Sequence, residues 1–435
     1  MFCYDFKLPD LSIIVYNTLL KNKDKYKKVP AFYVINFDDL SHSHRCNPLD
    51  PRMMTDITDA AESSRSILMG LNRQWSTKVG DFFVESPINF LTAVIWFLRE
   101  YEGGKFCSLP HVIELLSVDY RDLFPILGTV ETLTTYLSPF LTAYLNRAME
   151  QLEGQIASAK IGLARLSSPQ LYYVLSGDDF TLDLNNPDDP KVICCGNNPL
   201  KIQTYGAVLS LYVNRMLKLV NRKDQLKSAL IFDEYPTIYC PLDTCIATAR
   251  SNLVSVSIAV QSVEQLRKDY GREQAEVITS ICGNIISGQS TGDTAKLVSE
   301  RIGKIVQERE SVSINRTDTS FSRNTQLDYA VPSSRISMLT SGEVAGLVAD
   351  NPDEVIEYKA FHCMIQNDHA AIKAESDSYK PLPKIRDVSA LDIHNNYITI
   401  KNDIVEIVTT TIERIKSDPD LAHLLIIDEE PGKST

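Results

Sequence analysis

Short apolar runs alternate with helical or polar segments along much of this 435-residue chain, and this rhythm limits its possible folds most strongly. The runs lie at residues 31–36, 192–196, 229–232, 254–260 and 281–287. Strands that helices cover on both faces of a parallel sheet have this nearly continuous apolar composition. The alternation therefore predicts an α/β fold with a doubly wound, mostly parallel sheet.

The alternation stops in the middle of the chain. Gly103-Gly104 ends the helical pattern of residues 87–102 and predicts a domain boundary. No strand is apparent from residue 109 to residue 166, which indicates an all-helical insert. One long amphipathic helix is predicted there from apolar residues at alternating spacings of four and three: Leu145, Met149, Leu152, Ile156, Ala159, Leu163 and Leu166. We expect this stripe to pack on the insert's other helices, with a partner surface as the alternative.

The two ends of the chain carry weaker signals. Residues 2–6 look like a buried strand that lacks its predecessor in the sheet. Residues 311–334 are polar without an apolar period, which predicts a long mobile loop, and residues 354–361 predict a strand. Beyond residue 380 we expect one short helix at 404–415 and an acidic tail that ends in Asp428-Glu429-Glu430.

Composition restricts the classes of function. No stretch reaches the roughly 18 apolar residues of a membrane helix, and the start lacks the plan of a signal peptide, so we expect the chain as given to be soluble and cytoplasmic. Nine cysteines without CxxC pairs favour reduced thiols. The net charge of -12 opposes DNA binding over the whole surface, so any DNA contact should be local. Basic runs at 21–28 and 215–227 are available, although solvated faces are the preferred explanation of both.

The strongest chemical signal is Leu-Ile-Phe-Asp-Glu at residues 230–234, an apolar strand that ends in two adjacent carboxylates. This is the Walker B arrangement of P-loop motors, in which Asp233 would support Mg²⁺ on a nucleotide and Glu234 would polarise the attacking water. A strand running into a solvated acidic turn is the alternative. Gln261 ends the following strand, where RecA-like motors keep a sensor of the γ-phosphate.

The other half of a nucleotide site is absent from the sequence. No G-x-x-x-x-G-K-[ST] segment, whose amides and lysine cradle phosphates, occurs in the chain. Residues 288–296 contain two glycines after a strand, but Asp293-Thr294 stands where the Lys-Ser/Thr pair is required. This segment is therefore interpreted as a strand-to-helix turn. Nothing specific in the sequence supports nucleophilic catalysis.

Four segments follow one another at characteristic spacings: Ile-Phe-Asp-Glu-Tyr-Pro at 231–236, Ser-Ile-Ala-Val-Gln-Ser-Val-Glu-Gln-Leu at 257–266, Tyr270-Gly271 and Ile-Cys-Gly-Asn at 281–284. With these segments, residues 230–304 resemble the C-terminal motor half of TraG/TraD coupling proteins. With Asn-Pro-Leu at 47–49 and Phe-His-Cys at 361–363, the chain most resembles the mobilisation-type branch found in Bacteroides and relatives. This resemblance extends over nearly the whole chain.

The resemblance implies a RecA-like P-loop NTPase fold and a role in conjugation. Family members are hexameric, DNA-translocating ATPases of the inner membrane that pass relaxase-bound single-stranded DNA to a type IV secretion channel. Asp233 and Glu234 would be the Walker B pair, with Mg²⁺ held by Asp233 through nucleotide and water, and Gln261 would be the sensor. Asp5 and Lys7 resemble an Asp-x-Lys segment after the Walker A helix and would contact ATP.

By the same resemblance the chain divides into four parts. Residues 1–104 and 181–375 would form the motor domain, residues 105–180 the all-α domain that recognises relaxosome or cargo, and residues 376–435 an acidic tail. The sequence starts just after the place where membrane helices and Walker A are expected, which indicates a truncated, fragmentary or split motor. Two alternatives stay open: a non-catalytic adaptor that binds a relaxase or accessory protein, and a helicase or packaging ATPase outside conjugation.

Overall fold

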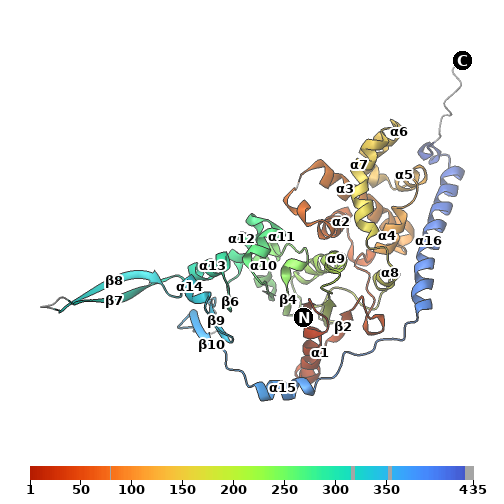
Figure 1. Cartoon of the computed structure of the whole chain (residues 1–435). Coiled ribbons are helices and arrows are strands. Elements are labelled where there is room, and N and C mark those ends of the chain that lie inside the picture. Colours follow the sequence, from red (N-terminus) through yellow and green to blue (C-terminus); the bar gives the residue numbers. More distant parts are fainter. Residues whose placement is uncertain (79, 315–318, 351–354, 427–435) are drawn as a thin grey trace. The chain divides into compact units, whose positions relative to one another are not determined.

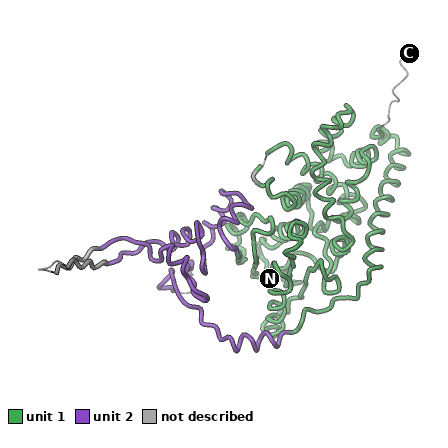
Figure 2. The backbone as a smooth tube through the Cα atoms, in the orientation of Figure 1, with its two compact units in different colours: residues 1–259, 380–435 green, residues 260–379 purple. Residues whose placement is uncertain are grey.

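In the computed structural model, which describes residues 1–78, 80–314, 319–350 and 355–426, the chain folds as two units (Figure 2). Unit 1 contains residues 1–259 and 380–435, and unit 2 contains residues 260–379. The second division lies close to the expected limit at residue 376, whereas residues 105–180 belong to unit 1. The finer division of the chain into family domains stays a prediction.

Unit 1 is built on a five-stranded sheet in the order β2-β3-β1-β4-β5, and every neighbouring pair of strands is parallel. The strands are β1 (Phe2–Asp5), β2 (Ala31–Ile35), β3 (Lys191–Gly196), β4 (Ser228–Phe232) and β5 (Val254–Ile258). Every residue of β1 and β3 is buried, as helices on both faces require. The predicted parallel α/β sheet is confirmed.

Helix α1 (Asp10–Asn22) covers one face of this sheet, where Leu11 and Val15 pack on Cys3, Val34 and Cys194. Helices α9 (Ile202–Val220) and α10 (Asp243–Ala249) lie in the connections that lead to β4 and β5. Strand and helix therefore alternate as the apolar rhythm predicts.

Between β2 and β3 the chain forms a run of α-helices (Figure 1): α2 (Ile57–Leu71), α3 (Phe82–Glu100), α4 (Leu109–Leu115), α5 (Tyr120–Gly128), α6 (Thr134–Leu145), α7 (Met149–Ala164) and α8 (Pro169–Leu175). The apolar stripe of α7 is buried at Leu152, Ile156, Ala159 and Leu163, and α7 contacts α3, α6 and α2. The stripe thus packs inside the helical region, as expected.

The prediction of one long helix through residues 145–166 is wrong at its start. Helix α6 ends at Leu145, and Arg147 adopts a left-handed backbone with φ of 55°. The amide of Ala148 then donates to the carbonyl oxygen of Ala143 at 2.9 Å, which closes the end of α6. Leu145 and Met149 are exposed, because they flank this turn instead of facing the core.

One segment, Phe82–Gly104, is long and apolar enough to cross a membrane by length and composition. It comprises α3 and the turn after it, and 72% of its most apolar window is buried. Helix α3 contacts α2, α4, α6 and α7, so it is a core helix of unit 1 whose apolar residues pack against its neighbours.

The C-terminal helix is far longer than the expected 404–415. Helix α16 (Ala390–Ser417) begins at a capping box formed by Ser389 and Asp392 and lies along α4, α5 and α8 (Figure 1). Its buried stripe comprises Ile400, Ile404, Ile407, Thr411 and Ile415. Thr411 is the one polar residue in this stripe. The acidic residues 428–430 lie outside the described residues.

Unit 2 holds a three-stranded sheet in the order β10-β9-β6, with β6 (Ile285–Ser287), β9 (Glu343–Leu347) and β10 (Ala360–Met364) in antiparallel pairs. Its α-helices are α11 (Val263–Tyr270), α12 (Arg272–Ile281), α13 (Gly292–Ile302), α14 (Ser333–Ile336) and α15 (His369–Asp377). The bounds of two predicted strands differ from those observed. Strand β6 is shorter than the predicted 281–287, and β10 begins at residue 360, whereas the predicted strand began at residue 354.

The predicted loop at residues 311–334 is wrong for most of its length. Strands β7 (Lys304–Ile314) and β8 (Thr319–Tyr329) pair in antiparallel register as a two-stranded ribbon. Residues 315–318 between them lie outside the described residues. Ile305, Val306 and Leu327 on this ribbon are exposed, so burial there leaves no alternating apolar pattern of the kind that usually predicts a strand.

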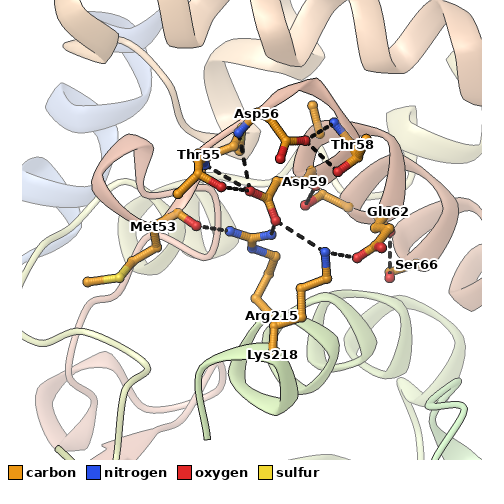
Figure 3. A network of polar contacts seen from close by, with 12 residues as sticks. Met53, Thr55, Asp56, Thr58, Asp59, Glu62, Ser66, Arg215 and Lys218 are labelled. Atoms are coloured by element: carbon orange, nitrogen blue, oxygen red, sulfur yellow. Dashed lines mark hydrogen bonds and ion pairs between the residues drawn. The ribbon is translucent and has the colours of Figure 1, made fainter. Parts of the chain in front are cut away.

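A buried ion-pair network joins α2 to α9 (Figure 3). The Asp59 carboxylate accepts from Arg215 and Lys218 at 3.1 Å each and from the amide of Thr55 at 2.8 Å. Arg215 also donates to the carbonyl oxygen of Met53 at 2.5 Å and is 4% exposed. The expectation of a solvated basic face at 215–227 is therefore wrong for Arg215, because its charge is neutralised inside the fold.

Burial alone raises the pKa of Asp59, but the Thr55 amide and the Lys218 and Arg215 cations outweigh burial and hold the pKa well below its usual range. The group therefore stabilises the fold in its ionised form. This contribution is complete above the unfolded pKa of about 3.9 and is lost as the pH falls through the lower folded value.

We expect Asp59→Asn to lower the free energy of unfolding by about 3–5 kcal/mol, because it leaves Arg215 buried without its counter-charge. Urea denaturation at pH 7 measures this change. Glu62→Gln is the matched control, since Glu62 pairs with Lys218 on the surface and its loss should cost about 0–1 kcal/mol. Equal effects of the two substitutions contradict the prediction. The difference between the original chain and Asp59→Asn should also shrink below about pH 4.

Candidate functional site

The candidate site lies where β4 ends at the carboxyl edge of the sheet of unit 1. Strand β4 runs between β1 and β5, and its residues Leu230 and Phe232 are fully buried. The amide of Asp233 donates to the carbonyl oxygen of Tyr4 on β1 at 3.1 Å. Asp233 and Glu234 are both half-buried. The strand therefore carries the two carboxylates to one edge and holds the first by its backbone.

Glu234 has a strained backbone. Its φ of 47° and ψ of 52° lie in the left-handed region, which costs a residue other than glycine about 1 kcal/mol or more. The amide and the hydroxyl of Thr237 donate to the Glu234 carbonyl oxygen at 2.9 and 2.6 Å. The amide of Tyr235 donates to the Ala259 carbonyl oxygen, just beyond β5, at 2.9 Å. These bonds hold the turn that carries the two adjacent carboxylates.

A buried hydroxyl cluster supports this turn from the sheet. The hydroxyl groups of Tyr4 and Thr237 lie 2.6 Å apart, and the side-chain amide of Asn197 donates to the Tyr4 oxygen at 2.7 Å. Burial raises the pKa of Tyr4 to about 12, so the phenol stays neutral. The cluster connects β1 and the end of β3 to the acidic turn. Sequence reasoning missed these residues, because Tyr4 reads as core and Thr237 as part of a loop.

Asp5 and Lys7, which the resemblance associates with ATP, have different surroundings. Asp5 is fully buried, and its Oδ2 accepts from the amides of Leu11 and Ser12 at 3.0 and 2.8 Å and from the Ser12 hydroxyl at 2.8 Å. Burial raises the pKa of Asp5 despite these bonds. Its carboxylate therefore fastens the start of α1 to the end of β1, and a contact of Asp5 with ATP stays a prediction.

Lys7 lines a pocket of about 250 Å³ at the carboxyl ends of β1, β2 and β3. The other lining residues are Leu8, Asn36, Phe37, Asp38, Gly196, Asn197, Asn198, Pro199 and Tyr205. Lys201 and Tyr205 both contact the Asp38 carboxylate beside it, at 2.5 and 2.8 Å. Asn197 joins this pocket to the hydroxyl cluster. A ligand contact of Lys7 stays a prediction.

Gln261 lies three residues beyond β5 and belongs to unit 2, so its position is described within that unit only. Its side chain is exposed. The sensor role that the sequence suggests therefore stays a prediction.

The glycine-containing segment 288–296 is a strand-to-helix turn, as interpreted from the sequence: β6 ends at Ser287 and α13 begins at Gly292. The Glu264 carboxylate accepts from the amide of Asp293 at 2.8 Å and from the hydroxyl of Thr294 at 2.7 Å. The Thr294 bond is the main cause that lowers the pKa of Glu264 to about 2. A protein carboxylate thus occupies the helix start where a phosphate loop binds its anion.

The residues at the end of β4 suit a hydrated Mg²⁺ on a nucleotide. Mg²⁺ keeps several waters and takes one or two carboxylates with substrate phosphates, and Asp233 supplies a hard, partly accessible oxygen ligand. Within the described ranges no group of three or more His, Cys, Asp or Glu could hold a metal directly.

Comparison with known proteins gives a consistent picture. A family model described as type IV secretory system conjugative DNA transfer matches residues 10–350. A search of curated proteins gave no match. The unbound monoclinic form of the bacterial conjugative coupling protein TrwBdeltaN70 is similar with a TM-score of 0.55 at 14% identity, over 84% of each chain.

Two nucleotide complexes of the plasmid coupling protein TrwB are similar as well. The complex with ADP and Mg²⁺ has a TM-score of 0.56 at 12% identity and covers 88% of this chain and 86% of that chain. The complex with the non-hydrolysable ATP analogue ADPNP has a TM-score of 0.54 at 12% identity, over 89% and 87%. At these identities the likeness establishes a shared fold, and the expected RecA-like motor fold is confirmed.

We expect Glu234→Gly to raise the free energy of unfolding by about 1 kcal/mol, because glycine adopts the left-handed backbone without steric cost. Thermal or urea denaturation measures this. Glu234→Gln is the control, since it keeps the strained backbone and should leave stability within about 0.5 kcal/mol of the original. A loss of stability in the glycine variant contradicts the strain at this position.

Proposed function

Because the chain belongs to the family of type IV secretory system proteins for conjugative DNA transfer, we propose that it is a coupling protein whose RecA-like motor uses ATP to drive DNA transfer. The observation that carries this proposal is the acidic turn: Asp233 and Glu234 stand at the carboxyl edge of a parallel sheet, the edge at which open α/β sheets bind ligands.

Each carboxylate has its own task. Asp233, held by its backbone to β1, would bind the water shell of a nucleotide's Mg²⁺. When bound, that ion neutralises charge on the phosphates. Glu234 would accept a proton from the attacking water, and the bonds from Thr237 hold its turn in place. Gln261 is proposed as the residue that senses the γ-phosphate.

The family context extends the proposal to partners and place of action. We assign the chain to the cytoplasmic side of the inner membrane, working with a relaxase complex, single-stranded DNA and a type IV secretion channel, as part of a hexameric ring. The formal charge of -12 requires that DNA contacts be confined to local strips. The helical region between β2 and β3 is the proposed surface for the relaxase. The family match argues against a helicase or packaging motor outside conjugation.

A second function, that of a non-catalytic adaptor, is favoured by one observation. The 435 residues contain no phosphate-loop motif, and the carboxylate of Glu264 occupies the start of α13 that most resembles one. In this function the motor fold is a scaffold, and the helical region binds the relaxase or an accessory protein.

Magnesium-dependent ATP binding and hydrolysis decide between the two functions. We expect the chain, together with any residues encoded upstream of it, to hydrolyse ATP. We expect Glu234→Gln to lower the rate by about 10²–10⁴-fold while nucleotide stays bound, because only proton transfer is removed. Glu62→Gln, on the surface of α2, is the matched control and should keep full activity. If neither the chain nor its extended form hydrolyses ATP but relaxase binding is intact, the motor function is wrong and the adaptor function is supported.

A further inference from the structure

The connections that lead into strands β2 to β5 lie at the amino edge of the sheet of unit 1, because all its neighbouring strands are parallel. This edge is opposite to the one at which Asp233 stands. The connections include residues 21–29 before β2, 185–189 before β3, 221–227 before β4 and 250–253 before β5. We call these four segments together the amino rim.

Hydrogen bonds join the segments of the amino rim into one surface. Such bonds run from the Lys28 ammonium group to the Asp188 carbonyl oxygen, from the Leu226 amide to the Asn185 carbonyl oxygen at 2.9 Å, and from the Asn252 side-chain amide to the Asn221 side-chain oxygen at 2.6 Å. The rim extends from β2 to β5, the first and last strands of the sheet, which is about 19 Å at the usual strand spacing.

The amino rim is basic although the protein is acidic. It contains nine Lys or Arg residues and four Asp residues, whereas the whole chain has a net charge of -12. All nine cations are exposed: Lys21, Lys23, Lys25, Lys27, Lys28, Arg222, Lys223, Lys227 and Arg250. Among the acids, Asp189 is paired with the buried Lys191 at 2.7 Å, which neutralises its charge. The rim therefore concentrates positive charge at one edge of unit 1.

The three basic segments of the rim also expose apolar or aromatic side chains. These residues are Tyr26 and Val29 before β2, Leu226 before β4 and Leu253 before β5, and each is between 42% and 53% exposed. Leu253 has a left-handed backbone with φ of 56°. Glycine or asparagine adopts this backbone more easily than leucine does, so folding does not explain an exposed leucine there. Cations and apolar side chains thus occur together on the same segments.

The apolar side chains indicate which polyanion fits the rim. Nucleic acids are bound largely through neutralisation of their phosphates, and their interfaces are more polar than those between proteins, so exposed Leu and Val side chains find little to contact there. An anionic membrane uses both kinds of residue. Lys and Arg meet the phosphates of the head groups, while Tyr, Leu and Val enter the boundary with the acyl chains.

We propose that the amino rim is a docking surface for an anionic phospholipid membrane. The lysine side chains reach the head-group phosphates with their ammonium groups, while their apolar stems lie along the boundary. In this orientation the edge of the sheet that carries Asp233 points away from the bilayer and stays open to water. The proposal concerns the edge opposite the candidate site, so it holds whether or not the chain hydrolyses ATP.

Flotation of the 435-residue chain with lipid vesicles tests the proposal at roughly 0.15 M salt and without nucleotide. We expect binding to vesicles of phosphatidylglycerol and phosphatidylcholine but not to vesicles of phosphatidylcholine alone. Combining Lys23→Glu, Lys25→Glu and Lys27→Glu should weaken binding at least roughly 100-fold, because each cation near an anionic surface strengthens binding about fivefold.

The matched control reverses three exposed lysines outside the rim and changes the net charge equally. It combines Lys78→Glu, Lys373→Glu and Lys416→Glu. We expect this variant to bind within about threefold of the original chain, because charges farther than a Debye length from the membrane are screened. Equal losses of binding in the two triple variants overturn the proposal, and so does equal binding to neutral and anionic vesicles.

Tryptophan fluorescence reports contact with the acyl boundary at a single position. Tyr26→Trp should shift its emission to the blue with anionic vesicles and be quenched by brominated lipid. Ile161→Trp, at an exposed residue of α7, is the matched control and should show neither change. The chain's own Trp75 and Trp96 give the same background in both variants. An unquenched tryptophan at position 26 overturns the docking of the rim.

The remaining outcomes separate this inference from its rivals. Binding of a single-stranded oligonucleotide that the rim variant loses, without any binding to vesicles, replaces the membrane surface with a nucleic-acid surface. Vesicle binding that persists in Glu234→Gln, or in a chain without ATP hydrolysis, upholds the docking surface independently of the motor. Hydrolysis without vesicle binding removes the docking surface and leaves the motor intact.

Discussion

Hydrogen bonding of β4 on both sides is the constraint on which the candidate site depends. On one side the Asp233 amide is bonded to Tyr4, and on the other the Phe232 carbonyl oxygen is bonded to Ala259. A strand fixed in this way ends at a defined place, so the turn after it can keep Glu234 in a conformation that an isolated peptide would leave. The strain is local, and its support comes from β1, from β5 and from Thr237.

The buried polar groups around this turn show how the sheet tolerates polarity in its interior. Tyr4, Asn197 and Thr237 satisfy one another, and burial keeps the phenol neutral, so no net charge is desolvated beneath the acidic turn. Asp5 differs, because its carboxylate is buried beside the amides at the start of α1. Asp5 and Lys7 are close in the sequence but have different surroundings. The buried Asp5 carboxylate holds the start of α1, whereas Lys7 lines a pocket.

The parts of the fold that could be predicted are those whose burial leaves a period in the sequence. Strand β3 is apolar because it is buried along its whole length, and the two acids after β4 stand out against an apolar run. The β7–β8 ribbon was not predicted, because its residues Ile305, Val306 and Leu327 are exposed and burial leaves no period there. Helix α16 was predicted too short, although its buried stripe is broken only at Thr411. The hydrogen bond between Tyr4 and Thr237 beneath the acidic turn could not be predicted either, because only the pairing of β1 with β4 brings these two residues together.

The return of the chain to unit 1 has a consequence for biosynthesis. Unit 1 combines residues 1–259 with the segment from residue 380 onward, while unit 2 is continuous. During synthesis from the N-terminus, all of unit 2 leaves the ribosome before α16 exists. The surface of α4, α5 and α8 that α16 covers is therefore exposed throughout that interval. A ribosome that stalls after residue 379 would release a chain whose second unit is complete but whose first unit lacks α16. Chaperones and proteases would act on the apolar surface left exposed on that first unit.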